Sequence, residues 1–582
     1  MAKERILKGI AVSKGISQGT VFVYETKDVK VMQTLIPSMY LEKEIERFLS
    51  ALERTKKELS NIKERINAEI GPDFAQFLDA QILMLKDRDI IGAVKKGIKA
   101  EKKNAEYVYH GVLSEYADKL CASKDQYLRE RVADIWDVGN RVLRNLAGFT
   151  HASVIEVPKG SVLVGHDISP SEAALINPDH VQGIAIEVGG RTSHTAITAR
   201  ALEIPAVVGV EGLLAKIENG ERVILDGNRG ILIKNPTPGR IQFYKGEIKR
   251  EIEYQKMLSP FCELPAKTRD GRQVDISANI EFSIEYAHAK KYGAMGIGLF
   301  RTEFLYLTRR GNPSEEEQFR VYNELAKKMK PDPVIIRTYD LGGDKIFSDY
   351  HEANPFLGWR AVRVSLDDVD FFKIQLRAIL RASVNRNIRI MYPMISTFEE
   401  IKQANAIFDE VQQELKKEKV DFDDHIQVGI MVETPSAALM SLQLAAHVDF
   451  FSIGSNDLTQ YVLAVDRGNE RVSHLFDHFH PAVLRLIKQV IDAGHKAHIW
   501  VGICGELGAD PLAIPLLIGL GIDEISMSPV AIPKAKMVLR ALTVPECEEI
   551  ATKALNFRGA NEVKKFLRRM IPKKFPGIGG MA

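Results

Sequence analysis

The stretch FFSIGSND, residues 450–457, decides the fold of the C-terminal half of this chain. It is an apolar, strand-like run that ends in a glycine and polar residues. Its neighbours along the chain, VGIMVE at 428–433 and WVGICGE at 500–506, have the same form. The intervals between these runs are long enough for a helix, so the pattern predicts parallel strands that alternate with helices.

Five further runs of this kind bring the number to eight. They are VDISANI from 274, GIGLFRTEFLYL from 296, VIIRTYDL from 334, IRIMYPMI from 388 and EISMS from 524. Eight parallel-type strands separated by helices predict a (β/α)8 barrel, also called a TIM barrel.

Polar residues close most of these runs, and chemistry in such barrels takes place at the C-terminal ends of the strands. The residues concerned are Asn279, Arg301, Glu303, Arg337, Asp340, Glu433, Asn456, Asp457, Cys504 and Glu506. Arg360 and Arg467 lie in or just beyond the loops that follow. A guanidinium group matches phosphate and carboxylate geometry, so four arginines at one barrel mouth favour a small polyanion as ligand. Taken singly, an arginine is more often a salt-bridge partner than a ligand contact, and it is the convergence of four that reverses this.

Two carboxylates and a thiol at these run ends allow two interpretations each. Glu433 and Asp457 suit Mg²⁺ shared with substrate oxygens, or they are rim acids that pair with the arginines. Cys504 is an inert core thiol, or it protonates a substrate carbon.

A second motif lies upstream of the barrel, in GGRTSHTAITAR at residues 189–200. Thr192 or Ser193 can cap a helix, which places His194 in its first turn. The positive helix end disfavours imidazolium and favours an anion attached to the ring, which suits phosphorylation of the histidine. A Gly-Gly turn followed by an exposed histidine is the alternative. The preceding strand, which we expect to end at Val188, provides the strand, turn and helix order of an anion site.

Composition limits the class of protein. The chain has 582 residues, of which 27% are charged and 45% hydrophobic, so we expect an ordinary globular protein of several domains. A net charge of +2 indicates neither nucleic acid nor an acidic membrane as partner. The four cysteines lie far apart, and we find neither a signal peptide nor an apolar run of 18 residues. We therefore expect a cytoplasmic protein with reduced thiols.

Four segments together resemble the enzyme I family of the bacterial sugar phosphotransferase system, the phosphoenolpyruvate-protein phosphotransferases. They are GGRTSHTAITAR at 189–200, PFLGWRAVRVSL at 355–366, DFFSIGSNDLTQYVLAVDRGNERV at 449–472 and GICGELGAD at 502–510. The resemblance covers nearly the whole chain. The histidine motif alone would also fit pyruvate phosphate dikinase and phosphoenolpyruvate synthase.

The resemblance implies a fold and a division into domains. The fold is a multidomain α/β protein in which a helical bundle stands beside a swivelling phosphohistidine domain, followed by a C-terminal TIM barrel. Residues 1–33 would complete the phosphohistidine domain of 148–234, and residues 34–147 would form the helical domain that binds the phosphocarrier protein HPr. Residues 235–265 would be a linker helix, and 266–582 the barrel that binds phosphoenolpyruvate.

The resemblance also implies roles for individual residues. Phosphoenolpyruvate would be held by Arg301, Arg337, Arg360, Asn456, Asp457 and Arg467. Mg²⁺ would lie on Glu433 and Asp457. His194 would take the phosphoryl group and pass it to HPr, and Cys504 would protonate the enolate to give pyruvate. Members of the family are usually dimers through the barrel, so we expect a homodimer.

Some positions depart from the usual family pattern. Ala173 replaces a threonine upstream of the histidine, Gln81 replaces a histidine in the helical domain, and Thr198 and Ser455 are mild changes.

Two other functions, a dikinase fragment and a sensor protein, are alternatives to the phosphotransferase. A dikinase fragment would need a nucleotide site, and residues 1–150 contain no P-loop or similar glycine-rich signature. A sensor of phosphoenolpyruvate without turnover would not need the proton donor Cys504.

Overall fold

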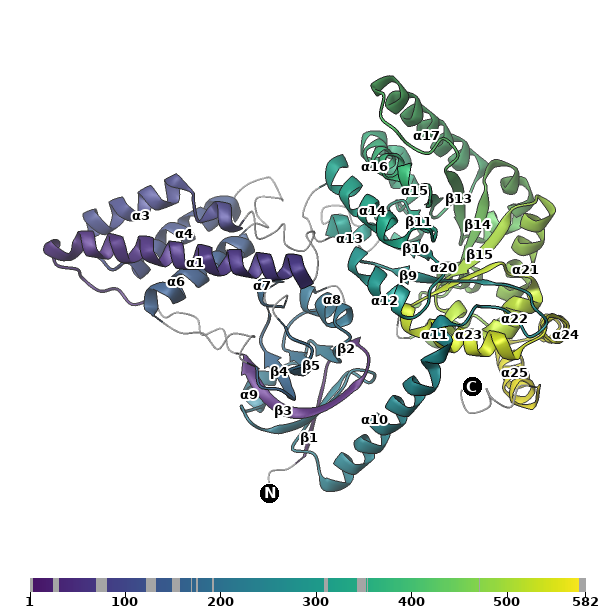
Figure 1. Cartoon of the computed structure of the whole chain (residues 1–582), viewed down its shortest axis with the longest axis horizontal. Coiled ribbons are helices and arrows are strands. Elements are labelled where there is room, and N and C mark those ends of the chain that lie inside the picture. The colour runs from purple at the N-terminus through teal and green to yellow at the C-terminus, as the bar shows by residue number, and fades with distance from the viewer. Residues whose placement is uncertain are drawn as a thin grey trace. The chain divides into compact units, whose positions relative to one another are not determined.

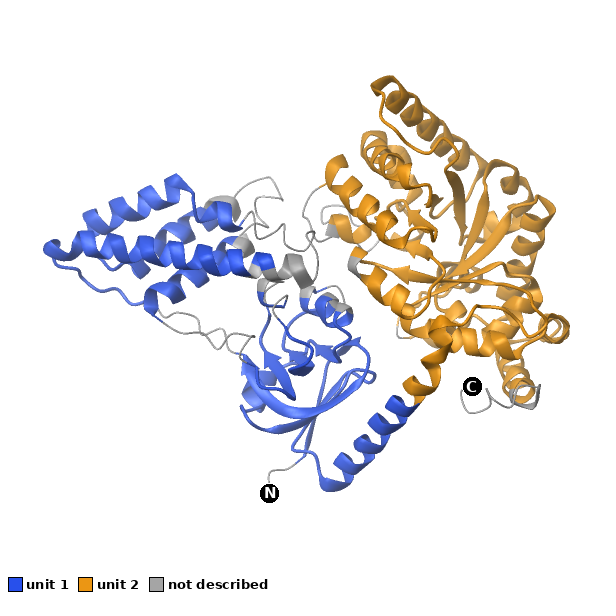
Figure 2. Cartoon of the chain, viewed as in Figure 1, with its two compact units in different colours: residues 1–253 blue, residues 254–582 orange. Residues whose placement is uncertain are grey.

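The computed structural model describes two compact units, residues 1–253 and 254–582 (Figure 2). Each is presented by itself. The described residues are 4–24, 31–69, 81–121, 132–148, 157–168, 170–173, 176–190, 193–307, 312–342, 352, 354–469 and 471–574.

The second unit contains the predicted barrel (Figure 1). All neighbouring strands pair in parallel, and the sheet closes because β16 pairs with β9. The strands are β9 (Asp275–Ile280), β10 (Ile297–Phe300), β11 (Val334–Arg337), β12 (Ile388–Tyr392), β13 (Gln427–Val432), β14 (Phe450–Gly454), β15 (Trp500–Cys504) and β16 (Glu524–Met527). Each of the eight apolar runs supplies one of them, which confirms the barrel.

The helices of this unit lie between and after the strands. They are α11 (Pro260–Glu263), α12 (Tyr286–Lys291), α13 (Glu303–Leu307), α14 (Glu315–Met329), α15 (Val362–Asp367), α16 (Val369–Ala382), α17 (Phe398–Glu418), α18 (Pro435–Leu439), α19 (Ser441–Leu444), α20 (Ser455–Leu463), α21 (Pro481–Lys496), α22 (Ala513–Leu520), α23 (Ile532–Ala541), α24 (Val544–Ala554) and α25 (Ala560–Lys574). The prediction of a single strand over residues 296–307 was wrong, because these residues form the short strand β10 followed by helix α13. The apolar residues after Thr302 pack from this helix, so apolar content alone did not separate the two elements.

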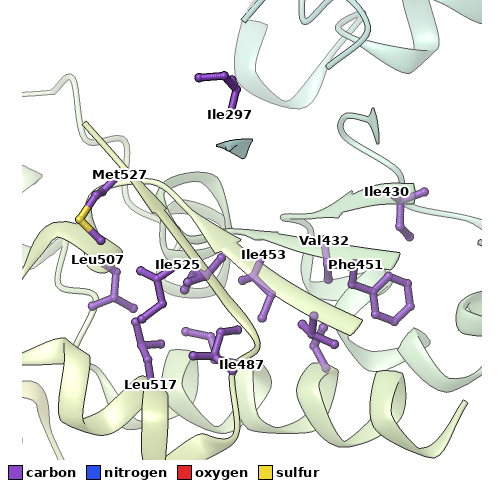
Figure 3. Close-up of a cluster of buried hydrophobic side chains, with 14 of the residues drawn as sticks. Ile297, Ile430, Val432, Phe451, Ile453, Ile487, Leu507, Leu517, Ile525 and Met527 are labelled. Atoms are coloured by element: carbon purple, nitrogen blue, oxygen red, sulfur yellow. The ribbon is translucent and has the colours of Figure 1, made fainter. Parts of the chain in front are cut away.

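Alternate residues of the barrel strands face opposite sides. Phe451, Ile453, Ile525 and Met527 face outward, where they pack against side chains such as Ile487 and Leu517 of the surrounding helices (Figure 3). The intervening residues face the barrel interior, where a separate cluster contains Leu299, Ile335, Met391, Met431, Phe450, Cys504 and Trp500. The strict alternation also turns the polar residues Ser452 and Glu524 inward.

Glu524 is a carboxylic acid in this interior, at the first position of β16. Its side chain is buried, and burial raises its pKa to about 7, although Ser277 and Arg389 act in the opposite direction. The folded protein therefore binds a proton at Glu524 more tightly than the unfolded chain does. Between about pH 4.5 and pH 7 this site makes the folded state less stable as the pH rises.

Replacing Glu524 with glutamine is expected to remove this loss of stability. Since a tenfold change in proton affinity corresponds to about 1.4 kcal/mol, the unfolding free energy of the variant relative to wild type should increase by about 2.5 kcal/mol between pH 5 and pH 8. Denaturant unfolding of the full chain at both pH values measures this difference. A difference that is the same at pH 5 and pH 8 would contradict the prediction.

The first unit contains a sheet in the order β1-β8-β7-β3-β4-β5-β6-β2. Its strands are β1 (Arg5–Lys8), β2 (Ile10–Ser13), β3 (Ile16–Tyr24), β4 (Ser161–Gly165), β5 (Val181–Ile186), β6 (Ala206–Val208), β7 (Arg222–Asp226) and β8 (Ile231–Lys234). The N-terminal strands pair with strands from beyond residue 160, since β1 pairs with β8, β2 with β6, and β3 with β4 and β7. Short helices α7 (Pro170–Ala173), α8 (His194–Ala201) and α9 (Leu213–Lys216) accompany the sheet.

Between β3 and β4 the chain forms a helical bundle of α1 (Leu41–Glu69), α3 (Arg88–Glu101), α4 (Ala105–Cys121) and α6 (Val132–Ala147). Phe48, Val94 and Val142 are fully buried in its core. Helix α10 (Pro238–Leu258) follows the sheet and contains the boundary between the two units. Within the described part of the chain, no helix is both long and apolar enough to cross a membrane.

Candidate active site

A buried ion-pair network occupies the C-terminal end of the barrel strands. Arg337, the last residue of β11, places Nη2 3.0 Å from Glu303 Oε1 and Nη1 3.3 Å from Asp340 Oδ2. Burial opposes the charged guanidinium, but Glu303 and Asp340 outweigh it and raise the pKa of Arg337 above its ordinary value. The arginine is therefore a fixed positive charge inside the barrel mouth.

Arg360 extends this network to the neighbouring strand ends. Its guanidinium binds both oxygens of Asp340, at 2.8 and 2.9 Å, and donates to Asp457 Oδ2 at 3.0 Å. The Arg360 Nη1 group donates to the hydroxyl of Tyr461, which itself donates to the carbonyl of Phe356. Arg360 thus joins the loop of residues 354–361 to helix α20.

Glu433 follows β13 and is fully enclosed at the same end of the barrel. Its Oε1 accepts a hydrogen bond from the backbone N–H of Met394 at 2.7 Å. Burial and the neighbouring carboxylates Asp457 and Asp340 raise the pKa of Glu433 well above its usual value. Glu433 lies close enough to the two buried arginines for both to lower this pKa, but they do not cancel the rise.

The buried acids outnumber the buried bases in this network. Glu303, Asp340, Glu433 and Asp457 are all buried, whereas Arg337 and Arg360 are the buried guanidinium groups among them. In addition, the buried Oδ1 of Asp457 has no hydrogen-bond partner. An excess of buried carboxylates, one of them with an oxygen that accepts no hydrogen bond, is the arrangement that a hard divalent cation stabilises.

Two more arginines lie at the edge of the network and are partly exposed. Arg301 follows β10, and its Nη1 is 2.7 Å from Glu281 Oε1. Arg467 places Nη2 3.6 Å from the otherwise unpaired Asp457 Oδ1. Their side chains are 38% and 41% exposed, so both can still reach an anion at the mouth.

Asn456 and Ser455 connect the ends of β14 and β15 at the start of α20. The Ser455 hydroxyl donates to the carbonyl of Cys504 at 3.1 Å, and Asn456 Oδ1 accepts from the N–H of Glu506 at 3.1 Å. These bonds hold the loop after Cys504 against the first turn of α20.

Cys504 ends β15 and its side chain faces the barrel interior. Its Sγ accepts a hydrogen bond from Ser452 at 3.5 Å and donates to the carbonyl of Ile453 at 3.7 Å. Burial raises the pKa of the Cys504 thiol to about 11, against the effect of the Ser452 hydroxyl. At neutral pH the thiol is therefore protonated, which is the state that a proton donor needs.

The histidine motif lies in the other unit. Helix α8 begins at His194, and its N-cap is Ser193, whose hydroxyl accepts from the N–H of Ala196 at 3.3 Å. Thr192, the other candidate cap, lies outside the described residues, as does the side chain of His194. Ala173, where the family usually has threonine, is fully buried in an apolar cluster with Ala196.

The structure brings several of the expected residues together in one barrel mouth. They are Arg301, Arg337, Arg360, Glu433, Asn456, Asp457, Arg467 and Cys504. Sequence reasoning gave no role to Glu303 and Asp340 and missed Tyr461 and Ser452. Tyr461 stands four residues after Asp457 on the same helix, and Ser452 is a polar residue inside an apolar strand; both were usable signals.

Three family models match the chain, and their order follows the domain order. The PEP-utilising enzyme N-terminal model matches residues 8–131, the mobile domain 157–230 and the PEP-binding domain 255–544. A phosphoenolpyruvate-protein phosphotransferase of Bacillus sp. (strain S) is 42% identical over 573 residues, which are 97% of this chain and 98% of the relative. The chain belongs to the phosphoenolpyruvate-protein phosphotransferase family.

Other members of the family are similar to the same extent. The phosphoenolpyruvate-protein phosphotransferase of Geobacillus stearothermophilus is 42% identical over 97% of this chain and 98% of its own length. That of Haemophilus influenzae is 39% identical over 97% of this chain and 99% of its own. The resemblance inferred from the four sequence segments is therefore confirmed over nearly the full length.

Proposed function

We propose that the barrel mouth binds phosphoenolpyruvate, that His194 receives its phosphoryl group, and that HPr is the final acceptor. The observation that supports this most directly is the buried network around Arg337 and Arg360, which fixes two guanidinium groups among carboxylates at the strand ends. Phosphoenolpyruvate carries a phosphate and a carboxylate, and both match such groups. Arg301 and Arg467 at the rim would complete the contacts to the phosphate.

The residues present fit a divalent metal ion, which we propose to be Mg²⁺. Glu433 and Asp457 are buried carboxylates, Asp457 Oδ1 has no hydrogen-bond partner, and the buried acids of the network outnumber its buried arginines. Among the described residues, His, Cys, Asp and Glu form no cluster of three or more that could hold a metal. Two protein carboxylates with substrate oxygens are the usual arrangement for Mg²⁺. When bound, Mg²⁺ would supply positive charge to the phosphoryl and enolate oxygens.

The chain's own residues would perform the remaining chemistry. An unprotonated ring nitrogen of His194 attacks phosphorus, while the arginines hold the phosphoryl oxygens and the carboxylate in position. Arg337 would stabilise the negative charge that develops on the departing enolate oxygen, because its guanidinium group stays protonated at any physiological pH. The protonated thiol of Cys504 then gives its proton to the enolate carbon, and pyruvate forms.

For transfer to HPr, the phosphohistidine domain would leave the barrel and turn to the helical bundle. Pro236, Pro238 and Gly239 stand between the sheet and α10, and hinges are commonly found at such element ends. We also propose a homodimer through the barrel, supported by the exposed apolar side chains of Leu439, Met440 and Leu442 at the junction of α18 and α19.

Purified protein, phosphoenolpyruvate, Mg²⁺ and HPr test this function together. We expect HPr to gain one acid-labile phosphoryl group per molecule only when the chain has His194, with one pyruvate released for each. Phosphorylation of HPr that requires ATP, or that persists in His194→Ala, would contradict the proposal and favour the dikinase alternative.

The helical domain presents several exposed apolar side chains, among them Leu35, Met39 and Leu83, and we propose Leu83 as a docking residue for HPr. Gln81 is buried, and its amide donates to Asp137 Oδ2 at 3.0 Å, so it is turned toward α6. Leu83, two residues later in the same helical segment, is 65% exposed. Replacing Leu83 with aspartate is expected to lower the rate of transfer to HPr at limiting HPr about tenfold to a hundredfold, the usual effect at an interface centre.

Rapid-quench measurement of transfer from the phosphorylated chain to HPr checks this result. Phosphorylation of His194 itself should be unchanged. The matched control is Leu475→Asp, because Leu475 is 55% exposed but belongs to the barrel unit. Equal loss of HPr transfer in both variants would show that Leu83 has no particular role.

A further inference from the structure

Beneath Cys504, the barrel interior contains a layer of three neighbouring positions that the proposed chemistry does not use. Ser452 on β14 is the cross-strand neighbour of Gly502 on β15, and Gly502 is the neighbour of Glu524 on β16. All three face inward, by the alternation that turns Cys504 and Phe450 inward. Because Gly502 has no side chain, the space beside it is filled by its neighbours, the Glu524 carboxylate and the Trp500 ring.

Two glycines make room for the Glu524 carboxylate. A Cβ at Gly502 would lie 2.5 Å from Oε2, and a Cβ at Gly298 would lie 2.6 Å from Oε1. A side chain at either glycine would displace the Glu524 carboxylate. The two glycines therefore leave the space that this carboxylate occupies. Oε2, the oxygen above Gly502, is buried and has no hydrogen-bond partner.

A buried acid with an unpartnered oxygen reduces stability and needs a reason. Ser452 provides a connection, because its hydroxyl donates to Cys504 Sγ at 3.5 Å. The order across the sheet is therefore thiol, hydroxyl and carboxyl, and the free carboxyl oxygen lies toward Gly502, the residue that separates Glu524 from Ser452 in the sheet.

Cys504 needs a proton source if it acts as proposed above, since each turnover leaves a thiolate. At that point the substrate end of the barrel would still hold pyruvate. We propose that Glu524 is a proton-relay residue that reprotonates Cys504 through the hydroxyl of Ser452. This inference rests on the role proposed for Cys504.

The step balances in protons and charge. The Cys504 S–H bond breaks, its electron pair stays on sulfur, and the proton forms the new C–H bond of pyruvate. The thiolate then takes the proton of the Ser452 hydroxyl, which is replaced by the acid proton of Glu524, either directly after a side-chain rotation or through one water molecule. The Glu524 carboxylate finally recovers a proton from solvent water.

The charged groups that face Glu524 lie at the lower end of the barrel. Arg389 on β12 attracts the carboxylate and Asp275 on β9 repels it, while Ser277 on β9 donates a hydrogen bond to it. Arg389 stacks on the Trp500 ring, 5.0 Å from its centroid, and Asp275 is exposed. The exposed Asp275 is the cross-strand neighbour of Glu524, at the end of the barrel opposite the proposed substrate. With a pKa of about 7, Glu524 can both give and take a proton near neutral pH.

Two isotope exchanges separate the relay from the rest of the reaction. Enzyme, Mg²⁺, phosphoenolpyruvate and pyruvate are brought to equilibrium in D₂O. Carbon-label exchange between pyruvate and phosphoenolpyruvate reports phosphoryl transfer and C–H cleavage. Deuterium entry into the pyruvate methyl group also requires that the thiol proton exchanges with solvent. If the relay is interrupted, Cys504 keeps the hydrogen that it took from pyruvate and returns it to the same carbon, so that no deuterium enters.

In Glu524→Gln we expect the ratio of deuterium entry to carbon exchange to fall about tenfold or more, because the amide cannot supply a proton. Ser452→Ala should have the same effect. The wild-type ratio should change with pH around 7, and this dependence should vanish in Glu524→Gln. Ser441→Ala also removes a buried serine hydroxyl, one that has no hydrogen-bond partner, and it serves as control that should leave the ratio unchanged.

The possible results are distinguishable. If both exchanges fall in parallel in Glu524→Gln, or if the ratio and its pH dependence remain as in wild type, Glu524 is structural and the inference is wrong. If Cys504→Ala retains deuterium entry, the proposed role of Cys504 fails instead. Carbon exchange in each variant also shows that it is folded.

Discussion

Phosphorylation of His194 by phosphoenolpyruvate is expected to slow about 10³-fold when Arg337 is replaced with lysine. The guanidinium group of Arg337 contacts Glu303 through one nitrogen and Asp340 through the other, and a lysine ammonium group cannot reproduce this geometry. The substitution would therefore weaken both buried ion pairs and displace one of the groups that bind the substrate. Loss of one preorganised donor to the charge of the transition state costs about 3 to 4 kcal/mol, which corresponds to a change in rate of this size. Single-turnover measurement of phosphoenzyme formation at limiting phosphoenolpyruvate checks the value.

Arg272→Lys is the matched control for this substitution. Arg272 donates to the backbone carbonyls of Ile518, Gly521 and Ile522 and stands before the start of β9, at the other end of the barrel. Its replacement should affect stability but not the rate. A rate for Arg337→Lys within a few-fold of wild type would mean that Arg337 serves only to hold the loops.

Replacing Asp457 with asparagine is expected to have an effect of similar size, about 10³-fold on the same rate. The substitution removes a charge that pairs with Arg360 and Arg467 and, by our proposal, contacts the metal. The concentration of Mg²⁺ needed for half-maximal rate should rise at least about tenfold. Titration of phosphoenzyme formation with Mg²⁺ measures both quantities.

Asp449→Asn tests the same chemical change at the opposite end of β14. Asp449 is exposed, and its carboxylate accepts from the N–H of Val428 at 2.7 Å. We expect no change in the Mg²⁺ requirement. If Asp457→Asn lowered the rate without changing that requirement, the assignment of Asp457 as a metal ligand would be wrong.

The barrel could be predicted from the sequence because its strands are apolar runs that end in polar residues. Arg337, Glu433 and Cys504 were identified for the same reason, since the end of each run marks the mouth of the barrel. The position of His194 at the start of a helix followed from the glycine pair and the Ser193 cap, both of which are local signals.

Other features depend on contacts between distant segments. Arg360 lies in a loop, and nothing in the local sequence indicates that it joins Asp340 to Asp457. The inward direction of Glu524 was equally hidden, because strands covered by helices are apolar on the outer face and partly apolar inside. The run from 296 to 307 contains a strand and a helix of similar apolar content, so it could not be divided before the structure was known.

The central claim is that phosphoenolpyruvate alone phosphorylates His194. Intact mass spectrometry of the chain mixed with phosphoenolpyruvate and Mg²⁺, without nucleotide or carrier protein, tests it most directly. We predict one acid-labile phosphoryl group per chain, an equal amount of pyruvate, and neither in His194→Ala. No phosphoryl group in the absence of a nucleotide, or an unchanged one in His194→Ala, would contradict the account.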